Sequence, residues 1–310
     1  MKLEALAKPR ALKQEILKTL LDYVCGVDDI LEDTPAGYQL SPFGQAVIKR
    51  YGKQTAEGIQ VNFFDVRTGA YGPVWSKLSG LLTGDEIYGE TLHRAGSFAE
   101  KGLYTSAKGM APALIEAIPA DAKIALELGV ETGLLECLGR ERRDLTLYGL
   151  DRNPEALAKC ARLAEREDVN HIKWLESDLF DTERWISELP NEIPGVIYTI
   201  HLHEFMASGR EKLVKLVQKL VQKLPNWRFV AIEQPRLEKE ARELISPARW
   251  LYSHSNILIH HLIKNGRILS RDEWTEIFED GGAASIDVRP TGYLEYQAYV
   301  VHLGEGAGAL

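Results

Sequence analysis

Apolar and polar positions alternate in a repeating way over the last two thirds of this 310-residue chain. From residue 123 onward, short apolar runs alternate with amphipathic helical stretches, and polar or glycine-rich turns separate them. Strand-helix alternation of this length predicts an α/β fold with a Rossmann-like, doubly wound sheet, in which ligands lie beyond the carboxyl ends of the strands. The predicted strands are 123–128, 145–150, 171–175, 195–200, 227–233, 284–289 and 295–302, and the predicted helices are 132–139, 154–165, 209–223, 239–264 and 271–281.

The N-terminal part has a different pattern. Apolar residues at helical spacing predict a helix over 12–24 that ends near Gly26. Residues 30–40 are typical of two short extended pieces about a Pro-Ala-Gly turn, and Ser41 opens a further helix with proline in its first turn. This order indicates a winged-helix-like unit used for packing and dimerisation. The predicted domains are 1–110, helical and winged-helix-like, which also covers the active site, and 111–310, Rossmann-like and catalytic.

The composition of the chain excludes several classes of binding partner. The net charge is −8, and lysines and arginines form no long cluster, which argues against a nucleic-acid surface. Three cysteines without paired spacing indicate buried thiols in a reducing compartment. No segment reaches the roughly 20 apolar residues of a membrane span, and no signal-peptide pattern opens the chain. We expect a soluble, cytoplasmic protein with a small-molecule substrate.

The most informative motif is a glycine turn between two predicted strands. One apolar run ends in Glu127 and a turn that contains Gly129, Glu131 and Gly133, and the next run ends on Asp151. Glycines let the backbone approach a ligand closely, and a carboxylate at the end of the second strand receives ribose hydroxyls. Glu131 would repel a pyrophosphate, so a neutral or cationic nucleoside fits this turn better than a dinucleotide.

Histidines form a second group of candidates. His201 and His203 directly follow the strand 195–200 and share one face if that strand continues. His254 lies on a helical stretch after the fifth strand, and both loops should open toward one pocket. Imidazoles titrate near working pH and serve as general bases, but they also bind metals. His260, on an apolar helix face, is interpreted as a packing or capping residue.

Four ordered motifs make the chain resemble class I S-adenosylmethionine (SAM) methyltransferases of small molecules. They are the glycine turn, Asp151, the Ser177-Asp178-Leu179-Phe180 run, and residues 269–278 before a Gly-Gly pair. The resemblance covers nearly the whole chain and is to the branch with an N-terminal winged-helix dimerisation domain, so it implies a homodimer. It also implies SAM contacts by Glu127, Gly129 and Gly133 at the methionine end, by Asp151 at the ribose, and by Asp178 with Leu179 or Phe180 near the adenine.

The chain departs from this family at Glu131, where a glycine is usual. A carboxylate at this position either belongs to a tolerated turn variant or meets the aminobutyrate end of the cofactor. The histidine region is similar to α-keto acid C-methyltransferases, in which two histidines hold a non-haem iron that chelates the keto acid. The similarity implies Fe(II) bound by His203 and His254, with His201 as the substitute if the strand register differs.

The alternative to an iron site is that one histidine acts as a base or hydrogen-bond donor to the substrate and the others are satisfied in the core. Transfer from a sulfonium needs in-line attack in a dry pocket, and aromatic faces attract the sulfonium. Tyr71 and Tyr104 are candidates for that role, with ordinary core packing as the alternative for each. The predicted catalytic residues are therefore His203, His201, Tyr71 and Tyr104, and Arg67 and Arg249 are candidates for pairing with a substrate carboxylate.

The predicted function is SAM-dependent methyl transfer to a small carboxylic acid, of α-keto or amino acid type, in secondary metabolism. Two alternatives stay open. Some proteins similar to this branch cyclise SAM itself to azetidine-2-carboxylate and release methylthioadenosine, and Glu131 could orient the attacking amine. A non-catalytic winged-helix regulator that senses a nucleoside is the other. The sequence does not name the acceptor or its nucleophilic atom.

Overall fold

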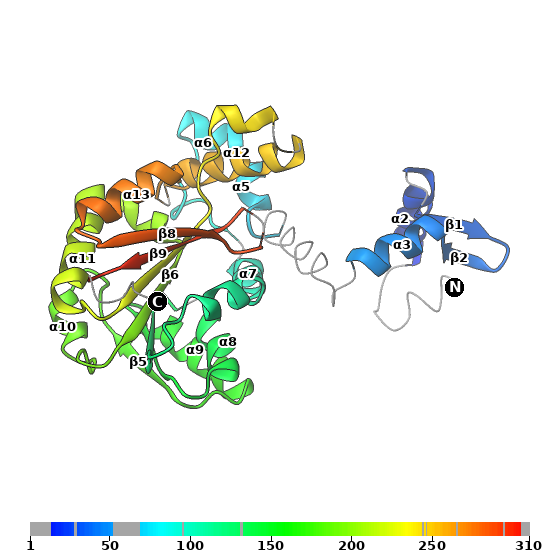
Figure 1. Ribbon diagram of the computed structural model, residues 1–310. Coiled ribbons are helices and arrows are strands. Elements are labelled where there is room, and N and C mark those ends of the chain that lie inside the picture. The colour runs from blue at the N-terminus through cyan, green and yellow to red at the C-terminus, as the bar shows by residue number, and fades with distance from the viewer. Residues whose placement is uncertain are drawn as a thin grey trace. The chain divides into compact units, whose positions relative to one another are not determined.

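The computed structural model describes residues 14–27, 30–51, 69–94, 96–130, 133–243, 245, 247–264, 266–293 and 295–304. The chain divides into two compact units, Met1–Asn62 and Phe63–Leu310 (Figure 1). The predicted domain boundary at residue 110 falls inside a continuous helix, α7 (Gly96–Glu116).

The first unit has the predicted order of helix, two strands and helix. The strands form an antiparallel pair in which Thr34 lies opposite Gly37. The Tyr38 hydroxyl donates a hydrogen bond to Asp22 of the first helix at 2.5 Å, which ties the helix to the hairpin. Ser41 caps the second helix by accepting the backbone N–H of Gly44. The elements are α2 (Gln14–Val27), β1 (Leu31–Thr34), β2 (Gly37–Leu40) and α3 (Pro42–Tyr51).

The second unit is built on a seven-stranded sheet with the order β5-β4-β3-β6-β7-β9-β8. The first five strands in this order are parallel, and β9 runs antiparallel to both of its neighbours. The strand order reverses between β3 and β6, so the fold is the predicted Rossmann-like α/β class with its switch point there. The strands are β3 (Ile124–Leu128), β4 (Thr146–Asp151), β5 (Ile172–Glu176), β6 (Gly195–Ile200), β7 (Arg228–Glu233), β8 (Ser285–Pro290) and β9 (Gln297–His302).

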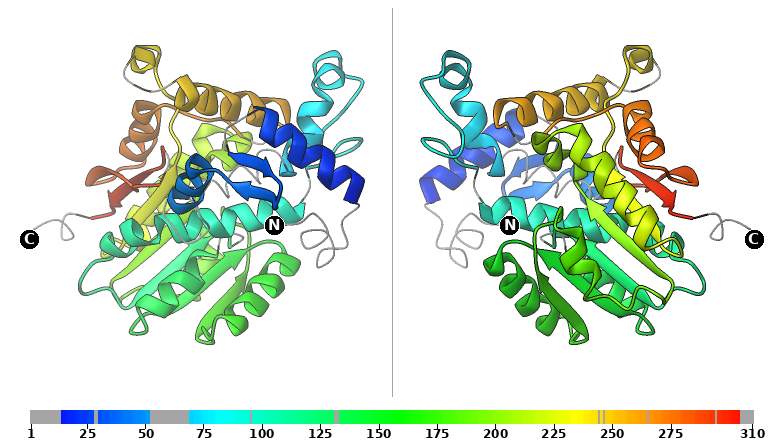
Figure 2. Two further views of the ribbon diagram at one scale, coloured as in Figure 1. Left: turned by 90° about the vertical axis from the view of Figure 1, so that its right-hand side faces the viewer. Right: turned by 90° about the vertical axis from the view of Figure 1, so that its left-hand side faces the viewer.

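Helices cover both faces of this sheet (Figures 1 and 2). Helices α7, α8 and α9 pack together in one layer, and α10, α11 and α13 pack in the other. Among the described helices, none is both long and apolar enough to cross a membrane. The bounds are α5 (Gly72–Ser76), α6 (Leu78–Thr83), α8 (Leu134–Glu141), α9 (Pro154–Arg166), α10 (Thr182–Ile186), η3 (Leu202–Ser208), α11 (Arg210–Lys223), η4 (Lys239–Glu243), α12 (Pro247–Leu262) and α13 (Arg271–Asp280).

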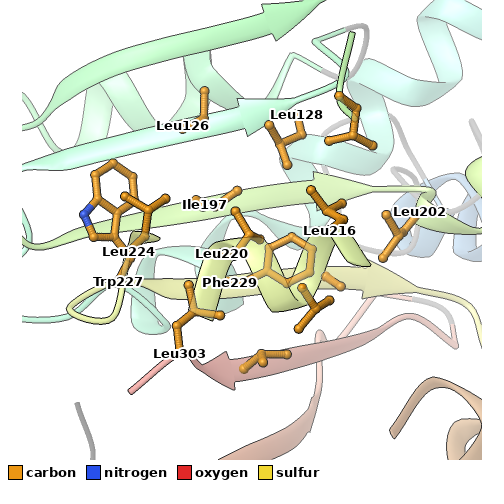
Figure 3. Packing of buried hydrophobic residues seen from close by; sticks show 14 of the residues in the cluster. Leu126, Leu128, Ile197, Leu202, Leu216, Leu220, Leu224, Trp227, Phe229 and Leu303 are labelled. Atoms are coloured by element: carbon orange, nitrogen blue, oxygen red, sulfur yellow. The ribbon is translucent and has the colours of Figure 1, made fainter. Parts of the chain in front are cut away.

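The core of the second unit lies between the sheet and the α11 layer (Figure 3). Leu126 and Leu128 of β3 and Phe229 of β7 are fully buried there. Each such side chain contributes about 1.5–3 kcal/mol on burial, which stabilises the sheet that positions the site. The close approach of Trp227 to β6 requires a glycine, since a Cβ at Gly195 would lie 2.9 Å from the indole ring.

Candidate active site

The predicted glycine turn is present at the carboxyl end of β3. Gly129 has φ +82°, and its backbone N–H donates to the Leu150 carbonyl at 2.8 Å, which ties the turn to β4. Gly133 has φ +72° and stands at the start of α8. Positive φ favours glycine at both positions. Glu127 is buried on β3, whereas Glu131 lies outside the described residues.

Asp151 and Asp178 follow neighbouring strands, as expected. Asp151 ends β4, and its carboxylate accepts the backbone N–H of Asn153 at 2.8 Å. Asp178 follows β5, and its carboxylate accepts the backbone N–H of Phe180 at 2.8 Å. The backbone N–H of Ser177 donates to the Asp151 carbonyl, which joins the two segments. Leu179, the residue after Asp178, is buried. The edge therefore presents carboxylates where the nucleoside site is predicted.

His203 forms the most ordered polar pair of the site. Its ring Nδ1 donates to Glu233 Oε2 at 2.7 Å, and its backbone N–H donates to Glu233 Oε1 at 2.9 Å. Both side chains are almost fully buried, at 3% and 1% exposed. Burial lowers the pKa of His203, but the charge and hydrogen bond of Glu233 outweigh it, so the pKa is raised above the ordinary value. Nε2 is buried and has no hydrogen-bond partner among the described residues.

His201 and His203 do not lie on a continuation of strand β6, which was the condition for their sharing one face. Strand β6 ends at Ile200, and His201 adopts the left-handed conformation with φ +66° before the short helix η3. The two imidazoles still meet, with ring centroids 5.3 Å apart, because the turn folds the chain back and not because a strand continues. Left-handed backbone is unusual for a residue other than glycine and is concentrated at functional sites.

The histidine of α12 that reaches this cluster is His260. Its ring centroid lies 4.6 Å from that of His203, so this buried side chain packs against the histidine pair. The ring of His254, the predicted metal ligand, is tilted against that of Trp250 with centroids 4.0 Å apart, and its Nδ1 lies 3.0 Å from the Trp250 carbonyl oxygen.

The structure gives no support to the predicted iron site. Nδ1 of His203 is held by Glu233, and Nδ1 of His254 lies beside the Trp250 carbonyl oxygen. Over the described part of the chain, no group of three or more His, Cys, Asp or Glu side chains has the arrangement to hold a metal ion. The assignment of Fe(II) to His203 and His254 therefore gains no support, and we derive no step through a metal.

A cationic and an aromatic side chain, Arg94 and Tyr71, also belong to the site. Tyr71, just before α5, is buried, and its hydroxyl oxygen accepts a hydrogen bond from Arg94 Nη1 at 3.3 Å. Arg94 was not singled out from the sequence. The charge of Arg94 contributes to a strongly lowered pKa of His201, after burial, His203 and His260. The side chain of Tyr104 lies outside the described part, as do those of Arg67 and Arg249.

Comparisons with known proteins place this geometry in context. No family model and no curated protein sequence matches the chain. Human N-acetylserotonin methyltransferase in complex with SAM is similar over 98% of this chain and 87% of its own, with a TM-score of 0.65 and 15% identity. The structure of PigF with SAH is similar over 97% of this chain and 89% of its own, with a TM-score of 0.62 and 14% identity. The structure of LaPhzM is similar over 97% of this chain and 88% of its own, with a TM-score of 0.64 and 17% identity.

The chain has a methyltransferase fold. This fold agrees with the resemblance seen in the motifs after β3, β4 and β5. At such low identity the likeness does not transfer a substrate, so the chemistry has to be argued from the residues.

Proposed function

We propose that the protein is a SAM-dependent methyltransferase that acts on a small carboxylic acid of α-keto or amino acid type, in secondary metabolism. The observation that carries the proposal is the buried pair of His203 and Glu233, which lies at the end of β6 and β7 beside the nucleoside edge. A non-catalytic nucleoside sensor has no need of such a pair, so the enzyme is favoured over the regulator.

The residues of the nucleoside edge fit SAM. A Cβ placed on Gly129 meets nothing within 4 Å, so the turn leaves space at the end of β3. Gly129, Gly133 and buried Glu127 would border the methionine end, Asp151 would receive the ribose hydroxyls, and Asp178 with Leu179 and Phe180 would border the adenine. SAM supplies a methyl group on a sulfonium, which an in-line nucleophile displaces.

His203 is suited to act as the general base. Because Nδ1–H is held by Glu233, Nε2 of the neutral ring carries the lone pair and can accept a proton from an O–H or C–H of the acceptor. Glu233 also stabilises the imidazolium that forms, and the burial of both side chains excludes water. The carboxylate thus comes from the last residue of β7, and the base from the short helix that follows the neighbouring strand β6.

Cyclisation of SAM to azetidine-2-carboxylate gains no support. Its motivation was Glu131, which lies outside the described residues, and the similar solved structures named above are methyltransferases or carry no stated cyclisation activity. The experiment below still separates it from methyl transfer.

The N-terminal unit is proposed as a winged-helix-like dimerisation element, so that the enzyme is a homodimer. A unit of about 60 residues is marginal on its own. Phe43 and Ile48 of α3 are 57% and 55% exposed and offer an apolar surface. Light scattering after size exclusion tests this assignment: a dimer that becomes a monomer in Phe43→Glu supports it, and a monomeric wild type contradicts it.

The test of the function is mass spectrometry of products formed from SAM with and without pyruvate, phenylpyruvate, phenylalanine and 4-methyl-2-oxopentanoate. We expect acid-dependent appearance of SAH and of a product heavier by one methyl group in place of hydrogen, and loss of both in His203→Gln. Methylthioadenosine released from SAM alone would instead establish cyclisation, and no product from any acid would contradict the proposal.

A further inference from the structure

Arg94 is a half-buried cation, and its hydrogen bond to Tyr71 leaves most donors of its guanidinium group unused. It lies between α6 and α7, and Nη1 donates to the Tyr71 hydroxyl. Among the described residues, no carboxylate forms an ion pair with it. A guanidinium carries several N–H donors in a planar fork, and one phenol satisfies only one of them. The charge of Glu204 acts on Arg94 without an ion pair between the two side chains, so the remaining donors of the fork can receive a carboxylate from a ligand.

Arg94 borders the same site as His203. Tyr71 packs in one cluster with Ile259 of α12 and with Ile263 just after that helix, and His260 of α12 lies against the His203 ring. The charge of Arg94 also reaches His201 and Glu204, the residues two before and one after His203. The guanidinium and the unpartnered Nε2 of His203 thus belong to one group of neighbouring polar side chains.

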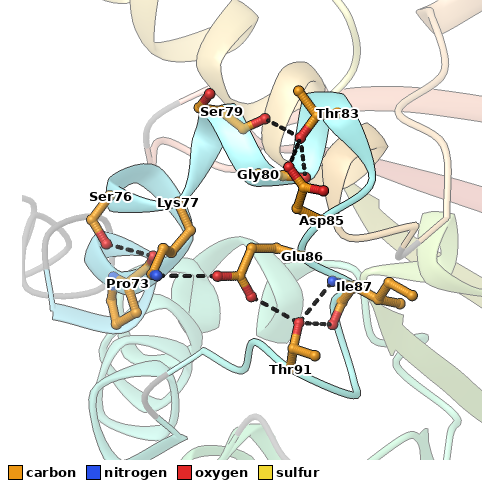
Figure 4. Close-up of polar contacts among 10 residues, drawn as sticks. All are labelled: Pro73, Ser76, Lys77, Ser79, Gly80, Thr83, Asp85, Glu86, Ile87 and Thr91. Carbon is orange, nitrogen blue, oxygen red and sulfur yellow. Dashed lines mark hydrogen bonds and ion pairs between the residues drawn. The ribbon is translucent and has the colours of Figure 1, made fainter.

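The segment that carries Arg94 is held in place by a polar network (Figure 4). The Glu86 carboxylate pairs with Lys77 at 3.1 Å and accepts the Thr91 hydroxyl at 2.8 Å. The Thr91 hydroxyl oxygen in turn accepts the backbone N–H of Ile87 at 2.9 Å. A binding residue needs such a fixed support, because the rotamer entropy lost on binding is then small.

We propose that Arg94 binds the carboxylate of the acceptor, with the Tyr71 hydroxyl beside it, and so places the reacting atom next to Nε2 of His203. This inference rests on the proposed methyl transfer and names the residue that selects its substrate. Planar guanidinium and carboxylate groups match in a bidentate manner. The charge of Glu204 acts on the same guanidinium, so a second negative group on the acceptor meets repulsion. A monocarboxylate therefore suits the site.

Binding, measured apart from turnover, tests the role of Arg94. The four acids named above are titrated by calorimetry into enzyme saturated with S-adenosylhomocysteine (SAH), and the tightest-binding acid and its primary amide are the probes. Arg94→Gln should raise the Kd of the acid about 10- to 100-fold. Arg94→Lys should raise it less, because charge remains but the fork is lost. The amide should bind wild type as weakly as the acid binds Arg94→Gln.

The matched control is Arg142→Gln. Arg142 pairs with Asp144 at 2.8 Å in the turn before β4, at the amino end of the sheet and away from the site, so its loss should leave the Kd of the acid unchanged. Unchanged SAH affinity shows that each variant is folded, and Arg94→Lys carries the test if the glutamine variant does not fold.

The outcomes separate this inference from the proposed function. Equal Kd values for the acid in wild type and Arg94→Gln, or equal binding of acid and amide, overturn the role of Arg94. So does methyl transfer to an acceptor without a carboxylate while none of the acids binds. Failure of SAH to bind, or absence of any methylated product, overturns the proposed function itself.

Discussion

The carbonyl oxygen of His203 lies 1.9 Å from the point where a Cβ at Gly266 would stand. Gly266 has φ +77°, and the backbone N–H of the next residue, Arg267, donates to the same carbonyl at 3.2 Å. The loop before α13 therefore presses directly on the backbone of the proposed base. A glycine is required there by both the conformation and the space.

Gly266→Ala should displace His203 and lower activity. We expect a loss of stability of about 1–3 kcal/mol from the strained backbone and the overlap, and a kcat reduced about 10-fold or more because the base is misplaced. Melting temperature and kcat measure the two effects. Gly282→Ala is the control, since Gly282 has φ +83° but open space around its Cβ: it should share the backbone cost and keep kcat. Equal kcat in both variants would contradict the positioning role.

Glu233→Gln should change the pH dependence of the reaction. Burial alone lowers the pKa of His203, and the Glu233 charge raises it. Without that charge the pKa of His203 falls, so the acidic limb of kcat/KM moves to lower pH while the plateau falls about 10- to 100-fold for the weaker base. The pH–rate profile tests this shift. Glu238→Gln, at an exposed ion pair with Arg236, should leave the limb where it is; a limb that also stays in place in Glu233→Gln would remove His203 from the reaction.

His201→Asn should make the free energy of unfolding fall less steeply as the pH decreases. Burial, followed by the charges of His203, His260 and Arg94, holds the pKa of His201 well below the ordinary value. The unfolded chain takes up this proton near pH 6.5 and the folded protein does not, so stability falls as the pH decreases below about 6.5, by up to about 1.4 kcal/mol per pH unit. Asparagine tolerates the left-handed conformation and removes this titration.

Urea unfolding at about pH 7 and about pH 5 measures the difference in slope between wild type and His201→Asn. His203 titrates in the opposite sense: its pKa is raised, so the stability linked to its proton is present below about pH 6.5 and is lost as pH rises through the folded pKa. An acid slope of the same size in both proteins would mean that His201 is not held neutral in the folded state.

Most strands of the catalytic unit could be predicted from the sequence. Parallel strands with helices on both faces are continuous apolar runs, and β3 and β6 are buried at every position. The five-residue helix α10 and the 3-10 helix η3 are too short to show helical periodicity and were not predicted. The predicted helix 239–264 is in fact two elements, because Pro247 fits only the first turn of α12.

The site divides in the same way. The positions of Asp151 and Asp178 were predictable, because neighbouring parallel strands bring their ends to one edge of the sheet. The turn at His201 is a single left-handed residue, which no periodicity indicates. Arg94 and His260 reach the site through tertiary packing against distant segments, and neither sits in a local motif.

The most direct test of the central claim is calorimetric titration of SAH into wild-type protein and Asp151→Ala, beside titration of a nicotinamide dinucleotide. The account predicts saturable heat with SAH, weakened about 10- to 100-fold by the loss of the charged hydrogen bonds to ribose, and no binding of the dinucleotide. Asp151 is partly exposed, so the variant should remain folded. Saturable heat from the dinucleotide with none from SAH would contradict the account.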